Sequence, residues 1–132
     1  MITKKILVVD NEEYIQEVTK ICLETTTKWE VITASSGVEG IKKAERDKPD
    51  AILLDVMMPD MDGITTFKHL QENIITKQIP VILLTAKFQN IDRSYYTDLG
   101  IKATIGKPFS PLTLAQEISQ ILGWGSEQYH DL

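Results

Sequence analysis

The fold is decided by residues 51–63, which read Ala51-Ile52-Leu53-Leu54-Asp55-Val56-Met57-Met58-Pro59-Asp60-Met61-Asp62-Gly63. The first four residues form an apolar run typical of a buried strand, and the second half is rich in the Pro, Asp and Gly of a loop. Asp55 therefore lies at the end of a buried strand, where an unpaired carboxylate is costly. We expect a site around Asp55 that neutralises this charge or uses it.

Short apolar runs alternate with helical patterns along the chain. Strands are expected at residues 5–9, 30–34, 51–54, 81–84 and 103–105, and helices at 12–25, 37–47, 64–73, 90–99 and 111–122. Because the strand sequences are apolar without strict alternation, both faces of the sheet should be covered. The pattern predicts an α/β protein, a flavodoxin-like doubly wound (βα)5 three-layer sandwich with a parallel five-stranded sheet of order 2-1-3-4-5.

The helices should turn apolar stripes toward the sheet, because residues three and four apart share a helix face. Gly100 is expected to end the fourth helix, and Pro111 to begin the fifth. The stripes expected in the first three helices are Ile15, Val18 and Cys22, then Val38, Ile41 and Ala44, and then Phe67, Leu70 and Ile74.

Length and composition predict one soluble domain. Residues 1–122 of the 132 are expected to form it, and residues 123–132 to be a short tail, since they lack an apolar period. The net charge of −5 argues against direct nucleic-acid binding. The single cysteine, Cys22, excludes an internal disulfide and a cysteine-based metal cluster. No apolar stretch approaches the ~20 residues of a membrane span, and a strand begins too early for a signal peptide, so a cytoplasmic location is expected.

Polar residues follow four of the five strands, at the end where each strand stops. In an open parallel sheet, sites form beyond the carboxyl ends of the strands near the point where the strand order reverses. The second strand, an edge strand in the expected order, ends without a charge at Ser35-Ser36. The four strands nearest the expected crevice end in Asp10-Asn11, Asp55, Thr85 and Lys107.

Each of these residues also has a purely structural interpretation. Asp10 could cap the first helix, with Glu13 completing a capping box, and Asn11 is also a good cap residue. Thr85 fits a strand, and Lys107 fits an exposed loop. Asp60 and Asp62 are expected to serve the turn and the start of the third helix. One polar group on each central strand, all at the same end, favours a site over these separate explanations.

These residue types suit phosphoryl transfer. The oxygens of Asp10, Asn11 and Asp55 suit a hard divalent cation such as Mg²⁺, and Lys107 or the cation would balance two close carboxylates. A carboxylate held in this way can attack phosphorus and form an aspartyl phosphate. Lys107 and the Thr85 hydroxyl would then stabilise the charge of the transferred group.

The sequence resembles the response-regulator receiver domains of two-component signalling, in particular stand-alone receivers of the chemotaxis-regulator type. The resemblance covers roughly residues 4–122. It rests on Ile6-Leu7-Val8-Val9-Asp10, on Leu53-Leu54-Asp55 with the loop up to Gly63, on Ile79-Pro80-Val81-Ile82-Leu83-Leu84-Thr85-Ala86, and on Lys107-Pro108-Phe109.

The resemblance implies a role for each site residue. Asp55 would be the phosphoacceptor, and Asp10, Asn11 and the backbone carbonyl of Met57 would join it at the Mg²⁺ site. Thr85 would be the switch hydroxyl, and Lys107 would contact the phosphoryl group, with a cis peptide before Pro108.

The same resemblance implies partners. The phosphoryl donor would be a histidine kinase or a histidine phosphotransfer protein, and a downstream protein would read the response. In many receivers the face of the fourth helix, fifth strand and fifth helix forms homodimers; here that face would include residues 90–99 and 112–122. The sequence leaves open whether the chain is a stand-alone receiver or a piece of a longer protein.

Two residues depart from the common receiver pattern. Asn11 replaces a second acidic residue, so Mg²⁺ binding is expected to be weaker than in a receiver with an acidic pair. Thr104 stands where many receivers have Tyr or Phe, so the usual aromatic switch cannot operate. Either Thr85 and the segment 87–99 carry the output change, or the coupling is weak.

Three classes of function follow. The favoured one is a phosphorylatable signalling switch that assists its own phosphotransfer and dephosphorylation without being an enzyme in the usual sense. The second is a pseudo-receiver that binds a partner without phosphorylation, which Asn11 and Thr104 favour. The third is a hydrolase with an aspartyl-phosphate intermediate. Such enzymes typically carry an acid two residues after the nucleophile, where this chain has Met57.

Overall fold

The computed structural model describes residues 3–86, 93–125 and 128–130. Its five strands form one parallel sheet in the order β2-β1-β3-β4-β5. This confirms the predicted fold class and strand order. The strands are β1 (Lys5–Val9), β2 (Glu30–Ala34), β3 (Ala51–Asp55), β4 (Val81–Ala86) and β5 (Ala103–Lys107).

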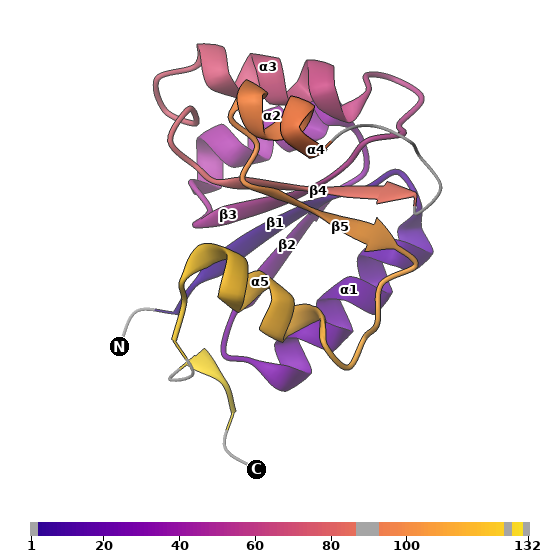
Figure 1. The fold of residues 1–132 in the computed structure, drawn as a ribbon, viewed down its shortest axis with the longest axis vertical. Coiled ribbons are helices and arrows are strands. Elements are labelled where there is room, and N and C mark those ends of the chain that lie inside the picture. Colours follow the sequence, from indigo (N-terminus) through magenta and orange to yellow (C-terminus); the bar gives the residue numbers. More distant parts are fainter. Residues whose placement is uncertain (1–2, 87–92, 126–127, 131–132) are drawn as a thin grey trace.

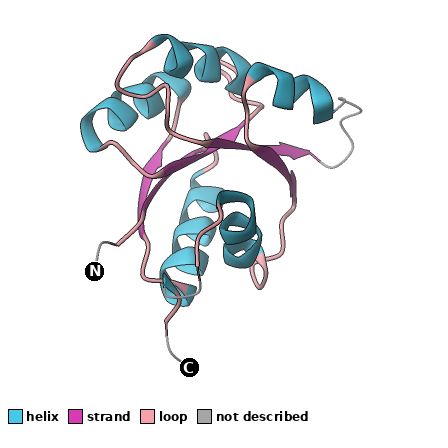
Figure 2. Ribbon diagram, turned by 60° about the vertical axis from the view of Figure 1, so that its left-hand side comes forward, coloured by secondary structure: helices cyan, strands magenta, loops and turns pink. Residues whose placement is uncertain are grey.

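Helices cover both faces of the sheet (Figures 1 and 2). Helices α2 (Gly37–Asp47), α3 (Gly63–Glu72) and α4 (Arg93–Leu99) lie on one face. Helices α1 (Glu13–Thr26) and α5 (Leu114–Leu122) lie on the other. In the part of the chain that the structure describes, no helix is both long enough and apolar enough for a membrane span.

The strands are apolar on both faces because each face packs against its own layer of helices. Leu7, Ile52 and Leu83 belong to the core cluster that includes Phe67 and Leu70 of α3. Their neighbours Ile6, Leu53 and Ile82 belong to the second cluster, with Leu23 of α1 and Ile118 of α5. Successive side chains of a strand point to opposite faces, so a continuous apolar run is what a two-sided core requires.

The phase of α1 differs from the prediction. The residues buried in this helix are Gln16, Thr19 and Leu23, whereas Ile15, Val18 and Cys22 are only partly buried. The reason is tertiary: the polar face of α1 turns inward, where Gln16 donates to the backbone oxygen of Asp10. The apolar stripe lies instead along the side of the helix that faces the loop before α5.

The end of α3 and the start of α5 also differ from the prediction. Helix α3 ends at Glu72, so Ile74, expected on its apolar stripe, is 80% exposed. Helix α5 begins at Leu114, since residues 111–113 form turns after Ser110. The helix predicted at 90–99 is observed as Arg93–Leu99, ending at Gly100 as expected (φ 106°); residues 90–92 lie outside the described residues. The second helix matches its predicted bounds.

The described residues after α5 lie below that helix in Figure 1 and contact the connection between α1 and β2. Trp124 meets Trp29 edge to face with ring centroids 5.1 Å apart. Tyr129 forms an antiparallel bridge with Thr27, and its hydroxyl donates to Ser119 Oγ at 3.1 Å. The described residues of the expected tail therefore pack against the domain.

Candidate functional site

The carboxyl ends of β1, β3 and β5 bring three charged side chains together. Lys107 Nζ lies 2.6 Å from Asp10 Oδ2 and 3.3 Å from Asp55 Oδ1. Asp10 follows β1 directly, while Asp55 and Lys107 are the last residues of their strands. The parallel order places β1 next to β3, so the two carboxylates meet at one edge of the sheet. The lysine thus bridges both acids.

These charges are largely removed from water. Asp10 is fully buried, and Asp55 is 4% exposed. Burial, and then the charge of Asp10, raises the pKa of Asp55 above its usual value, although Lys107 and the Met57 N–H act in the opposite direction. Burial alone would lower the pKa of Lys107, but Asp10 and then Asp55 outweigh it, so its pKa lies above the usual value. Lys107 is therefore a cation at neutral pH, held between the two acids.

Asp10 is positioned by the backbone around it and does not cap α1. Its Oδ1 accepts the backbone N–H of Glu12 at 2.9 Å, and Glu12 is the N-cap residue of α1. The capping box with Glu13 is therefore not formed, because the helix begins two residues too late for it. The other oxygen of Asp10 is left to Lys107.

The loop after β3 is closed tightly on itself. The Met57 N–H donates to Asp55 Oδ1 at 3.3 Å, and the Gly63 N–H donates to the Val56 carbonyl at 2.8 Å. A Cβ at Gly63 would collide with the backbone of Asp55 and Val56, so only glycine fits this close approach. Asp62 caps α3 by accepting the Thr65 N–H at 2.7 Å, as expected.

The other predicted site residues lie at the same edge. Thr85 is half-buried near the end of β4, one residue beyond the Asp55–Leu84 pair, so it belongs to the strand as well as to the candidate site. Asn11 and Met57 are exposed beside Asp10 and Asp55. The peptide between Lys107 and Pro108 is cis, as the resemblance implies.

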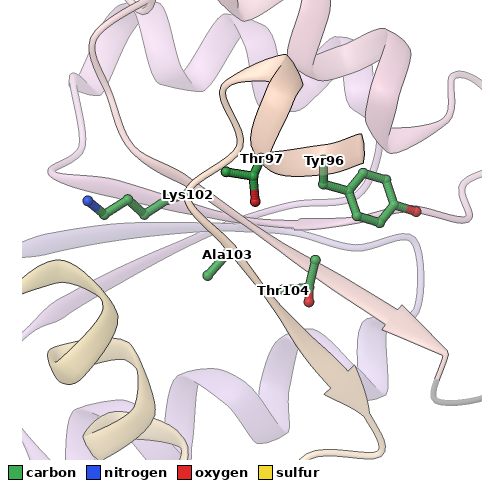
Figure 3. A pocket seen from close by; sticks show the side chains of 5 residues that line it. All are labelled: Tyr96, Thr97, Lys102, Ala103 and Thr104. Carbon is green, nitrogen blue, oxygen red and sulfur yellow. The ribbon is translucent and has the colours of Figure 1, made fainter. Parts of the chain in front are cut away.

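Thr104 leaves space under α4 (Figure 3). It lines a cavity of about 210 Å³ with Tyr96, Thr97, Lys102 and Ala103, which come from α4, β5 and the turn between them. Tyr96 is buried, and among the described residues its hydroxyl has no hydrogen-bond partner. A buried aromatic side chain thus comes from α4, next to the small Thr104.

The oxygen atoms at this end of the sheet suit a hard divalent cation, but few of them carry a negative charge. In the described ranges, no three side chains of His, Cys, Asp or Glu are grouped so that they could hold a metal. An ion at this edge would depend on two carboxylates, those of Asp10 and Asp55. Asn11 and the Met57 carbonyl could add only neutral oxygens, which Mg²⁺ accepts together with water.

Sequence reasoning missed two residues that shape this site. Gln16 is buried on α1 and donates to the Asp10 carbonyl at 2.6 Å and to Ser35 Oγ at 3.1 Å. Asp60, expected to serve its own turn, accepts N–H groups of Gly37 and Val38 at the start of α2. Gln16 lies outside the apolar stripe predicted for α1, so the spacing of apolar residues does not indicate that it is buried. No local signal identifies the helix that Asp60 caps.

The fold, the strand-end acids and the bridging lysine define a class of signalling domain. The family model of the response regulator receiver domain matches residues 6–119, and the chain belongs to this family. It is 44% identical over 119 residues to the alkaline phosphatase synthesis transcriptional regulatory protein PhoP of Bacillus subtilis, covering 90% of this chain and 48% of that protein. It is 37% identical over 120 residues to the transcriptional regulatory protein SrrA of Staphylococcus aureus, covering 91% and 48%. The chain thus spans about half the length of these relatives.

Solved structures show the same fold. The chemotaxis response regulator CheY4 of Vibrio cholerae superposes with a TM-score of 0.81 at 28% identity, covering 91% of this chain and 99% of that one. The receiver domain of the sensor histidine kinase PA1611 from Pseudomonas aeruginosa gives a TM-score of 0.80 at 26% identity, covering 92% and 99%. That structure has a magnesium ion coordinated in its active site cleft.

Proposed function

We propose that this receiver is a phosphorylation switch in which Asp55 accepts a phosphoryl group. The observation that carries the proposal is the Lys107 ammonium, which lies between Asp10 and Asp55 at the carboxyl end of the sheet. An acceptor carboxylate needs a fixed positive charge beside it, because the incoming phosphoryl group adds negative charge next to two buried acids.

The transfer requires one bond to form and one to break. An oxygen of Asp55 attacks phosphorus, the bond from phosphorus to the imidazole nitrogen of the donor breaks, and the imidazole leaves with the electron pair and is neutralised by a proton. Lys107 balances the charge on the phosphoryl oxygens, and Thr85 at the end of β4 is the hydroxyl expected to reach one of them. The later attack of water on phosphorus would release phosphate and restore Asp55.

Mg²⁺ would be held by Asp10, Asp55, Asn11 and the Met57 carbonyl. When bound, it supplies positive charge that brings acceptor and phosphoryl oxygens together. The magnesium ion in the PA1611 receiver supports this assignment. Since Asn11 brings no charge, we expect binding to be weaker here than in a receiver with an acidic pair.

The donor protein would dock on a groove that we name the α1 groove. One cavity of about 400 Å³ reaches from Lys107 and Pro108 to Val18. A second of about 340 Å³ continues from Val18 past Ile21 to Leu112. Ile21 is 66% exposed and Leu112 93%. Because the groove ends at Lys107, an apolar helix seated in it could present a phosphohistidine to Asp55. The donor would be a histidine kinase or a histidine phosphotransfer protein in the cytoplasm.

A pseudo-receiver is the alternative function, and two residues of the chain favour it. Asn11 removes one metal-binding charge, and Thr104 removes the usual aromatic switch side chain. In that case the domain would bind its partner without phosphorylation, and the Lys107 bridge would be a structural ion pair.

Acetyl phosphate labelling separates these functions. The protein is incubated with Mg²⁺ and acetyl phosphate and its intact mass is measured, with Asp55→Asn as the control. A phosphoryl adduct in the wild type that is absent from the variant supports the switch. A folded wild-type protein without adduct supports the pseudo-receiver and contradicts the proposal. Steady turnover of many organic phosphates would instead indicate a hydrolase.

A further inference from the structure

The loop after β3 is attached to a helix that carries no site residue. Asp60 Oδ1 accepts the Gly37 N–H and Asp60 Oδ2 accepts the Val38 N–H, both at 3.3 Å. These are two of the N–H groups that a helix start leaves without an intrahelical partner. Desolvation would raise the pKa of Asp60, but the N–H groups of Gly37 and Val38 outweigh it, so its pKa lies below the usual value.

A second contact fixes the loop at the same point. A Cβ at Gly37 would collide with Thr66 Oγ1 and would press against Met61. Gly37 is buried, so the backbone at the start of α2 lies close to Met61 in the loop and to Thr66 of α3. Such a close approach leaves the loop little freedom to shift relative to α2.

The residue before the α2 N-cap is also linked, through Gln16, to the backbone of Asp10. Ser35, just before α2, accepts a hydrogen bond from Gln16 at 3.1 Å, and the same amide donates to the Asp10 carbonyl. The β2–α2 connection has no charged strand end of its own. It nevertheless contacts the Met57 loop through Asp60 and the Asp10 backbone through Gln16.

We propose that Asp60 is a positioning residue, which holds residues 56–62 against α2 so that the Met57 carbonyl stays available to the metal beside Asp55. This inference rests on the proposed function, since it concerns the Mg²⁺ site of the same carboxylates. Outer partners of metal ligands typically change metal affinity by about 10-fold or more when they are removed.

Helix α2 also has an N-cap residue of its own, which accepts a different N–H group from those that Asp60 accepts. Ser36 is the N-cap residue, and its hydroxyl accepts the Glu39 N–H at 3.1 Å. Ser36→Ala therefore removes one hydrogen bond from the start of α2 and leaves the loop attached. It is the matched control for Asp60→Ala, which removes bonds from the same helix start and also releases the loop.

The experiment compares Asp60→Ala, Asp60→Asn and Ser36→Ala by NMR titration with MgCl2 at constant ionic strength. We expect Asp60→Ala to raise the Mg²⁺ Kd about 10-fold. Asp60→Asn keeps one acceptor oxygen and should raise the Kd less than Asp60→Ala does. Ser36→Ala should leave the Kd within about twofold of the wild type, since it keeps the loop attached. Equal Kd values for the wild type and Asp60→Ala, or equal losses in Asp60→Ala and Ser36→Ala, would overturn the proposal.

A metal-free measurement keeps the inference separate from the proposed function. Amide hydrogen exchange of Met57 and Gly63, measured without Mg²⁺, reports how firmly the loop is held. Faster exchange in Asp60→Ala but not in Ser36→Ala supports the positioning role even if the wild type binds no Mg²⁺, a result that would count against the proposed function alone. Unchanged exchange in Asp60→Ala would overturn the positioning role.

Discussion

At the scale of single residues, Lys107 decides whether two buried acids can share one edge of the sheet. It approaches Asp10 more closely than Asp55, 2.6 Å against 3.3 Å. Asp10 also receives the Glu12 N–H at 2.9 Å, whereas the Met57 N–H lies 3.3 Å from Asp55. Asp55 is therefore the less well compensated of the two buried acids, which is consistent with its raised pKa.

Asp55→Asn is expected to stabilise the unmodified domain. The folded state raises the pKa of Asp55 above its ordinary value of 3.8. The folded protein thus binds this proton more tightly than the unfolded chain, and stability falls as pH rises from the unfolded to the folded pKa. Above that window the charge of Asp55 destabilises the folded state, and Asn removes this penalty. Urea unfolding measures the gain, which should shrink as pH falls toward 4.

The exposed acid Glu17 supplies the control for this change in net charge. Glu17→Gln should leave the free energy of unfolding within about 0.5 kcal/mol of the wild type. Mg²⁺ should stabilise the wild type more than Asp55→Asn, because the variant lacks one of the two carboxylates. If Asp55→Asn is no more stable than the wild type at pH 7 without Mg²⁺, Lys107 fully compensates the charge of Asp55.

Asn11→Asp is expected to strengthen Mg²⁺ binding about 10-fold, since it adds a third carboxylate to a site that has two. Asn11 is exposed, so the new charge needs no desolvation before it meets the ion. Isothermal titration at constant ionic strength measures both affinities. Glu12→Gln tests whether the neighbouring acid already supplies the missing charge. Equal affinities for Asn11→Asp and the wild type would refute the idea.

At the scale of elements, the sequence predicted the parts that depend on local pattern. Strand β3 and the residue that ends it followed from the apolar run and the loop composition, because a short apolar run bounded by turn residues is typical of a buried strand. The common edge of Asp10, Asp55 and Lys107 followed from topology, since parallel strands end on one side. The roles of these residues remain predictions that rest on the resemblance.

What could not be predicted depends on contacts between distant residues. In α1 the side that faces the sheet includes Gln16, which donates to the Asp10 carbonyl, whereas the predicted stripe is only partly buried. Asp60 has the sequence signature of a turn residue, yet it caps a helix more than 20 positions earlier. Neither partner is recognisable from the spacing of nearby residues.

The α1 groove, which is lined by exposed apolar residues of α1 and of the loop before α5, leads to a prediction about the donor protein. Ile21→Asp and Leu112→Asp should each slow phosphotransfer from a phosphohistidine donor about tenfold, because a charge in the α1 groove opposes an apolar contact. Labelling by acetyl phosphate should stay within about twofold of the wild type, since neither residue touches the carboxylates. Stopped-flow or gel-based transfer assays measure the rates.

The matched control for the groove variants is Ile74→Asp. Ile74 is 80% exposed and follows α3, a helix on the opposite face of the sheet from α1. It should therefore leave both reactions unchanged. Equal losses in Ile21→Asp and Ile74→Asp would point to a general effect of charge, and the α1 groove would not be the donor site.

At the scale of the whole molecule, the site and the C-terminal segment occupy opposite ends of the sheet. Lys107, Asp10 and Asp55 lie beyond the carboxyl ends of the strands. Trp124 contacts Trp29, which lies just before β2. Lys4 Nζ lies 5.2 Å from the centroid of the Trp124 ring. Stability gained from the segment should therefore be independent of the phosphoryl transfer proposed for Asp55.

Trp124→Ala is expected to lower the free energy of unfolding by about 2 kcal/mol, because it removes an edge-to-face aromatic contact and uncovers the buried Trp29. Trp124→Phe keeps a ring there and should lose less. Urea unfolding followed by circular dichroism measures both variants, since the fluorescence itself changes with the mutation. Phosphorylation of Asp55 by acetyl phosphate should remain at the wild-type rate in both. A large loss of labelling in folded Trp124→Ala would mean that the two ends of the sheet are coupled, and that this segment belongs to the switch.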